Sequence, residues 1–302
     1  MQSLDTLMTS KSNEKLDFSL KGLLKSHIGM LIAAPNVGKS HLALCLAMEH
    51  ASSMTLVGMT ACSEPKKTLV LSSEDGAAVI QERMQKKLES CSVGLKNELN
   101  SHLHFMTDME PIVVPTDSSV DELSENRDYL NRLIDIFSQF DLVIVDTVTE
   151  AIGRCEEVRH DRLIKNTFQE LAQKSGASLL LVHHVNKDEI RGNQEITMAS
   201  GAGLTSIMRL TKCLFTLKSN KDGLSIKYLK SNYLPVLESK EFTVEIRQEL
   251  TVNPELFSLK LKNKRESRVV KKVGESPAAI KLSGSLPQEK EIKNKKTLRN
   301  IL

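Results

Sequence analysis

An eight-residue stretch, Ala33–Ser40 with the sequence AAPNVGKS, constrains this chain more than any other. An apolar run precedes it and a helical pattern of Leu and Ala follows it, as in a phosphate-binding loop between a buried strand and a helix. Such a loop needs backbone N–H groups around a β-phosphate, a cation near the β and γ oxygens, and a hydroxyl for Mg²⁺. Gly38, Lys39 and Ser40 supply these groups in order, although Ala33 replaces the usual first glycine.

The loop therefore predicts a site for a nucleoside triphosphate, ATP, together with Mg²⁺. The residues expected to contact ATP are Ala34, Pro35, Asn36, Val37, Gly38, Lys39, Ser40 and His41. The plainer alternative is a helix start that carries a lysine by chance.

The composition favours one large α/β domain. A chain of 302 residues with 40% hydrophobic content can bury a sizeable core, and no apolar run approaches the length of a membrane span. The N-terminus lacks the pattern of a secretion signal, so we expect a cytoplasmic protein without a membrane partner. Five widely spaced cysteines without a C-x-x-C pair predict reduced thiols and neither disulfides nor zinc.

Charge divides the chain unevenly. From Lys260 onward, thirteen Lys or Arg face four Glu, a balance of +9, which leaves about −6 for the preceding body. We therefore divide the chain into a flexible polar arm (1–15), an ATPase domain (16–263) and a basic tail (264–302) too polar to bury much surface. The tail has three open interpretations: nonspecific affinity for nucleic acid, a solubilising segment, or a segment that binds a replication partner.

Strands and helices are expected to alternate along the first 185 residues. Expected strands span 28–32, 68–72, 102–107, 140–147 and 177–185, and expected helices span 39–53, 76–88, 121–140 and 158–174. This order predicts a mainly parallel sheet with helices on both faces. A polar loop (186–200), a short helix (203–212) and four β-like segments (213–217, 224–230, 242–247 and 256–261) predict an antiparallel C-terminal extension. Residues 16–24 are expected to cover the sheet edge or a neighbouring subunit.

Two carboxylates follow apolar strands. Asp146 ends one strand, and because parallel strands share a carboxyl edge, it is expected to bind Mg²⁺ together with Ser40. Glu74 ends another strand and is assigned as the general base that activates the attacking water. The alternatives are a capping role for Asp146 and a helix-starting acid for Glu74.

Two histidines and two loop cations are further candidates. His183 and His184 alternate across a strand, so one of them faces the nucleotide edge, and we favour His184 as the sensor of the γ-phosphate. Satisfaction by local hydrogen bonds is the alternative for both. Lys187 and Arg191 are candidates for contact with nucleic acid phosphates, although solvated loop charges explain them equally well.

With these residues in place, the chain resembles the RecA-like hexameric replicative helicases, most closely the plasmid-encoded RepA kind. The resemblance covers roughly residues 16–233, through LDFSLKGLL, AAPNVGKS, SSED, VIVDT, LVHHVNK, SGAGLTSIMRL and KSNY. Alanine at the first loop position followed by Pro35 is also similar to the bacterial replicative helicase DnaB.

The resemblance implies a ring of six subunits with ATP at each interface. It matches Glu74 to the catalytic glutamate, Asp146 to the Mg²⁺ carboxylate and His184 to the γ-phosphate sensor. It also matches Arg209 to an arginine finger supplied by the neighbour, with Lys230 as a second cation across the interface. The implied activity is a helicase or translocase on single-stranded DNA, serving replication of a plasmid or mobile element. A RecA-like recombination or loading ATPase and a non-hydrolysing scaffold remain alternatives.

Overall fold

The computed structural model describes residues 3–4, 16–185, 204–220, 223–234 and 241–244. Most of the arm (1–2 and 5–15), the polar loop at 186–200 and the tail at 264–302 lie outside the described residues, as does the expected strand 256–261. The helices are α2 (Lys39–His50), α3 (Ala77–Leu88), α4 (Val93–His102), α5 (Val120–Phe137), α6 (Val148–Ala151), α7 (Asp161–Ser175) and α9 (Thr205–Leu210). The strands are β1 (Phe18–Leu20), β2 (Leu23–Leu24), β3 (Ile28–Ala33), β4 (Thr68–Ser72), β5 (Leu103–Met106), β6 (Leu142–Asp146), β7 (Ser178–His184), β8 (Cys213–Asn220), β9 (Gly223–Ser231) and β10 (Phe242–Val244).

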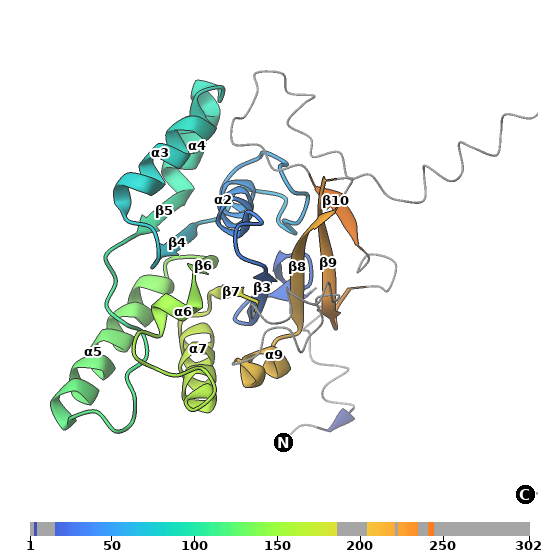
Figure 1. The fold of residues 1–302 in the computed structure, drawn as a ribbon. Coiled ribbons are helices and arrows are strands. Elements are labelled where there is room, and N and C mark those ends of the chain that lie inside the picture. The colour runs from blue at the N-terminus through green and yellow to red at the C-terminus, as the bar shows by residue number, and fades with distance from the viewer. Residues whose placement is uncertain (1–2, 5–15, 186–203, 221–222, 235–240, 245–302) are drawn as a thin grey trace, which may run out of the picture. The chain divides into compact units, whose positions relative to one another are not determined.

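The described strands include a large sheet of eight in the order β10-β9-β8-β3-β7-β6-β4-β5 (Figure 1). All pairs from β8 to β5 are parallel, and the sheet turns antiparallel at β9. This confirms the mainly parallel sheet with an antiparallel extension. The expectation for residues 213–217 needs one correction, because β8 itself runs parallel to β3 and the change of direction comes one strand later.

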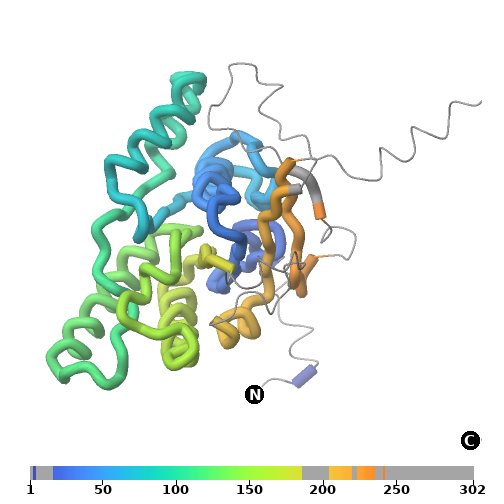
Figure 2. The backbone as a smooth tube through the Cα atoms, in the orientation of Figure 1, coloured from blue at the N-terminus to red at the C-terminus, as the bar shows by residue number. Residues whose placement is uncertain are grey.

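Each face of the sheet packs against its own helices. One apolar cluster joins α2 with buried residues of α3 and α4, and the other joins α5, α6, α7 and α9. In Figures 1 and 2, α2 lies between α3 with α4 on one side and β8 with β9 on the other. Almost all of α2 is buried, which explains why its apolar residues show no single face.

Residues 18–24 form a β1–β2 hairpin, which the sequence did not predict. Leu20 and Leu23 are buried in the core of this same chain, so their burial requires no neighbouring subunit. The Ser19 hydroxyl lies 2.7 Å from that of Ser178, at the first residue of β7. The hairpin therefore packs where β7 begins, away from the end where the phosphate loop lies.

Candidate active site

The phosphate loop joins the end of β3 to the start of α2. Gly38 caps α2 with a φ of 103°, a left-handed backbone conformation that favours glycine. The first N–H groups of α2 are thereby left facing the loop, where an anion would lie. The sequence order of strand, glycine and helix specifies this geometry locally.

Lys39 follows directly and is only 5% exposed. Its Nζ donates a hydrogen bond to the Ala34 carbonyl at 3.2 Å, so the side chain curls back over the loop. Burial lowers the pKa of Lys39, and the charges of Asp146 and Glu74 oppose that shift. The charges of the two predicted carboxylates therefore both affect the pKa of the lysine in the phosphate loop.

Asp146 ends β6 and is 8% exposed. Burial raises its pKa to about 6, while hydrogen bonding by Ser40 and the charge of Lys39 pull the pKa down. Its Oδ1 has no hydrogen-bond partner among the described residues. A buried carboxylate oxygen left unpaired beside a serine hydroxyl is a donor set that suits Mg²⁺, which prefers oxygen ligands.

Glu74 follows β4 at the same edge of the sheet, because Ser72 of β4 is in register with Asp146 of β6. Its Oε2 lies 3.6 Å from Nε2 of His184, and the two side chains are 52% and 35% exposed. Burial is the main cause that lowers the pKa of His184; the charge of Lys39 acts in the same direction and Glu74 opposes it. The charges of Glu74 and Lys39 thus both affect His184, which places the three side chains near one another.

His183 points to the opposite face. Leu179 and Leu181 of β7 pack in the cluster of α5 and α7, and His183 follows the same alternation. Its Nδ1 lies 3.4 Å from the Thr149 hydroxyl and 3.7 Å from a Glu157 oxygen. Local contacts therefore suffice for the Nδ1 of His183, whereas His184 is the histidine at the nucleotide edge.

Arg209 and Lys230 lie at the other end of the strands. Arg209 is exposed on α9, directly before β8 begins. Nζ of Lys230 donates to the Arg209 carbonyl at 2.8 Å and contacts the Met208 carbonyl at 3.4 Å. Lys230 thereby caps the C-terminus of α9, and its expected role across an interface stays a prediction.

The structure also reveals contacts near the site that the sequence did not predict. The Ser73 N–H donates to the Asp146 carbonyl at 2.9 Å, and its hydroxyl donates to the Thr147 carbonyl at 2.7 Å. Asp75 pairs with Arg83 of α3. The motif SSED signalled Ser73 and Asp75, but nothing in the pattern indicated Arg83.

The remaining predicted residues, Lys187 and Arg191, lie outside the described residues. Within the described ranges, no group of three or more His, Cys, Asp or Glu is arranged to hold a metal ion. Likewise, none of the helices described is long and apolar enough to cross a membrane.

A family model described as an AAA domain matches residues 4–189, which include the phosphate loop, Glu74, Asp146 and both histidines. No protein with a curated description matches the sequence. Among solved structures, one isolated ATPase domain is 12% identical and superimposes with a TM-score of 0.55, over 84% of this chain and 99% of its own. A KaiC-like protein from the hyperthermophilic archaeon Pyrococcus horikoshii is 13% identical with a TM-score of 0.50, over 78% and 96%. At these identities the likeness shows a shared fold, that of RecA-like P-loop ATPases.

Proposed function

The chain belongs to the AAA domain family, and from this premise we propose that it is a ring-forming ATPase that uses ATP hydrolysis to move along single-stranded DNA. One observation carries the catalytic part of the proposal. The unpaired Oδ1 of Asp146 lies at the sheet edge that also holds Lys39, Glu74 and His184. A purely structural loop has no need of an unpaired buried carboxylate oxygen.

Each residue then has a defined task. Lys39 binds the β and γ oxygens of ATP, and Ser40 with Asp146 would hold Mg²⁺, which when bound neutralises phosphate charge. Glu74 accepts the proton of the attacking water, since its exposed carboxylate is open to solvent. His184 donates a hydrogen bond to a γ-phosphate oxygen and loses that partner on hydrolysis.

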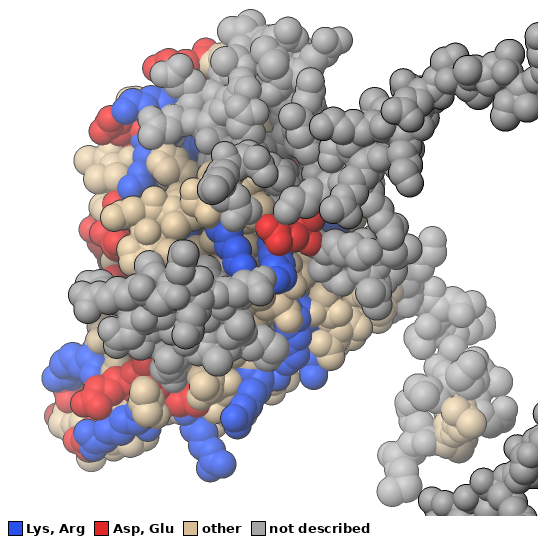
Figure 3. Space-filling model, turned by 45° about the vertical axis from the view of Figure 1, so that its right-hand side comes forward, with Lys and Arg blue, Asp and Glu red and all other residues tan. Residues whose placement is uncertain are grey.

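The proposed ring rests on Arg209. The site of one subunit contains Lys39 but lacks, among the described residues, a free arginine beside Glu74. An arginine from a neighbour would stabilise the charge that develops on the transferred phosphoryl group. Figure 3 turns the side with β8, β9 and α9 forward and shows Lys and Arg side chains running down the middle of that face. Such a face suits the anionic nucleotide of an adjacent copy.

The DNA part of the proposal comes from the sequence. The polar segment with Lys187 and Arg191 follows His184 directly, so a change at the γ-phosphate would act on it first. The basic tail adds affinity for phosphates or for a replication partner. The proposed setting is replication of a plasmid or mobile element.

The first test is phosphate release by the native chain, Lys39→Ala and Glu74→Gln. We expect both variants to lose about 10²-fold or more in kcat, because each removes a group that acts on the reacting phosphate or water. Glu74→Gln should still bind a fluorescent ATP analogue, whereas Lys39→Ala should bind it weakly. Glu125→Gln, an exposed glutamate on α5, is the matched control. Equal and negligible rates in all four proteins would favour a non-hydrolysing scaffold.

A second test separates translocation from loading. Single-stranded DNA should raise the ATPase rate, and the native chain should displace a strand from a forked duplex, whereas Glu74→Gln should not. Stimulation by DNA without strand displacement would favour the recombination or loading ATPase.

A further inference from the structure

The loop that carries Glu74 is anchored on both sides of that residue. Before it, Ser73 is held at its N–H and its hydroxyl by the end of β6. After it, the Asp75 carbonyl accepts a hydrogen bond of 2.7 Å from the Ser72 hydroxyl. Glu74 itself is exposed, and the one ion-pair contact of its side chain among the described residues is to His184. The orientation of the Glu74 side chain therefore depends on how firmly Ser73 and Asp75 are held.

Asp75 has one strong side-chain partner. Nη1 of Arg83, two turns into α3, donates to Oδ2 of Asp75. The two side chains are only 26% and 22% exposed, so this pair is better shielded from solvent than a typical surface ion pair. The contact ties the loop after β4 to the helix that follows it.

The charge of Asp75 also bears on the site. It adds to the causes that raise the pKa of Asp146, after burial and the charge of Glu74. Glu74 and Asp146 act on Lys39, and Asp75 adds a third negative charge that acts on Asp146, although the proposed chemistry requires only two carboxylates. Without a cation of its own, Asp75 would be a competing oxygen ligand for Mg²⁺.

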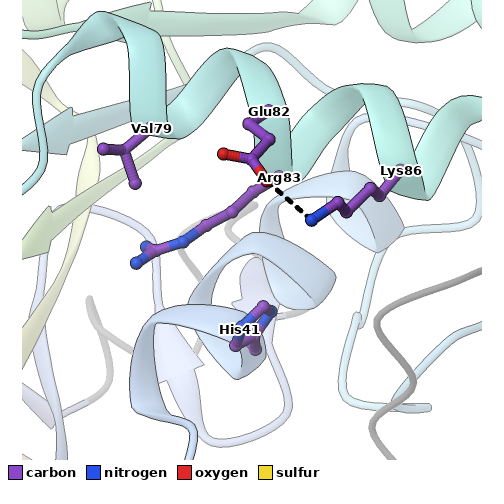
Figure 4. Close-up of a pocket in the computed structure, with 5 residues that line it drawn as sticks. All are labelled: His41, Val79, Glu82, Arg83 and Lys86. Carbon is purple, nitrogen blue, oxygen red and sulfur yellow. Dashed lines mark hydrogen bonds and ion pairs between the residues drawn. The ribbon is translucent and has the colours of Figure 1, made fainter.

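Packing alone does not fix the guanidinium. Arg83 lines a cavity of about 180 Å³ between α3 and the first turn of α2, together with His41, Val79, Glu82 and Lys86. In Figure 4, Arg83 extends from α3 past His41, while Glu82 and Lys86 pair with each other. Because open space lies beside Arg83, its pairing with Asp75 sets its direction.

We propose that Arg83 is a positioning residue for ATP hydrolysis: it holds the Asp75 carboxylate out of the magnesium site and so keeps Glu74 aimed at the attacking water. This inference rests on the proposed ATPase function. Arg83 itself touches neither nucleotide nor water.

The test compares Arg83→Gln, Asp75→Asn and the double variant in steady-state ATP hydrolysis. Arg83→Gln should lower kcat by about 10-fold or more while KM for ATP changes less than about 3-fold. The variant loses the orientation of Glu74 but keeps the residues that bind ATP. The double variant should recover the part of that loss that comes from an unpaired Asp75 carboxylate competing for Mg²⁺, because a neutral amide is a weaker ligand than a carboxylate. The matched control is Arg127→Gln, which breaks the Arg127–Glu170 ion pair between α5 and α7 and should leave kcat unchanged. A double variant no better than Arg83→Gln would overturn the role through Asp75.

Amide hydrogen exchange separates this inference from the ATPase proposal. Without nucleotide, Arg83→Gln should speed exchange in the segment 72–76, and Arg127→Gln should not. If the native chain hydrolyses no ATP, the proposed function fails, and exchange still shows whether Arg83 fixes the loop. Unchanged exchange in Arg83→Gln would overturn the positioning role in either case.

Discussion

His50, the last residue of α2, is 1% exposed. Its Nδ1 lies 2.7 Å from the Thr68 hydroxyl, and its Nε2 lies 3.6 Å from the Cys62 sulfur. Burial lowers the pKa of His50 to about 4, and burial is also the main cause of the pKa of about 4 for His183. Both rings are therefore neutral in the folded protein at pH 7, and protonating either one opposes folding.

The folded protein should lose stability as the pH falls from about 6.5 to about 4. In this window the two histidines bind protons in the unfolded chain but stay neutral in the folded chain. The free energy of unfolding therefore decreases, by about 3 kcal/mol per histidine. Urea unfolding of the native chain at pH 7.5, 5.5 and 4.5 measures this decrease. His50→Gln should unfold with a flatter pH dependence, whereas His104→Gln, at an exposed histidine, should follow the native curve. Parallel curves for His50→Gln and the native chain would contradict the assignment.

At the scale of single residues, the sequence predicted the positions of side chains that follow from neighbours in the chain or from the topology of a parallel sheet. Lys39 and Ser40 follow Gly38 directly, and Asp146 ends a parallel strand, so all three reach one edge. Arg83 could not be predicted in this way. Its partner Asp75 lies eight residues earlier, and the pairing depends on the angle at which α3 leaves the sheet.

At the scale of elements, one side chain organises the segment after α2. Glu49 is 1% exposed, and its two carboxylate oxygens accept hydrogen bonds from the backbone N–H groups of Leu56, Val57, Gly58, Met59 and Thr60. That segment in turn binds the β1–β2 hairpin, through a bond of 2.7 Å from the Lys21 N–H to the Met59 carbonyl. A single glutamate thus connects the phosphate-loop helix to the hairpin.

Glu49→Gln should lower the free energy of unfolding by about 2–4 kcal/mol, because a neutral amide replaces a charged acceptor and turns an N–H group toward other donors. Urea unfolding at pH 7.5 measures the loss. Glu98→Gln is the matched control, since Glu98 is only half-buried and accepts bonds from the N–H and hydroxyl of Ser53 in the neighbouring turn. The control should lose less than about 1 kcal/mol. Equal losses in the two variants would mean that burial of the five hydrogen bonds adds nothing to the free energy of unfolding.

Elements were predicted well where an apolar run spans a buried strand, as at Thr68–Ser72, and where a helix has a clear period. The helix expected to end near residue 53 ends at His50 instead, where the chain turns toward the segment held by Glu49. The helix Val93–His102 escaped prediction because only Leu99 of its ten residues is buried. The β1–β2 hairpin escaped because its pairing depends on the sheet end that it covers.

At the scale of the whole molecule, the two proposed halves of the catalytic centre lie at opposite ends of the strands. The phosphate loop follows Ala33, which is in register with Leu217, whereas Arg209 precedes Cys213, in register with Gly29. A strand rises roughly 3.3 Å per residue, so about 13 Å separates the two ends before loops are counted. We therefore expect a subunit's own Arg209 to lie too far from its own nucleotide, so that a catalytic role for Arg209 would require a second copy.

Mixing two inactive variants tests that requirement. Arg209→Ala and Lys39→Ala should each hydrolyse ATP poorly, since one lacks the arginine and the other lacks the phosphate-binding lysine. In a random mixture of equal parts, about a quarter of the interfaces would combine an intact Lys39 with an intact Arg209, so about a quarter of native activity should return. The same logic predicts that the native rate per subunit falls on dilution. A mixture as inactive as its parts, with a native rate that stays constant on dilution, would place the complete catalytic centre within one chain and remove the ring from the mechanism.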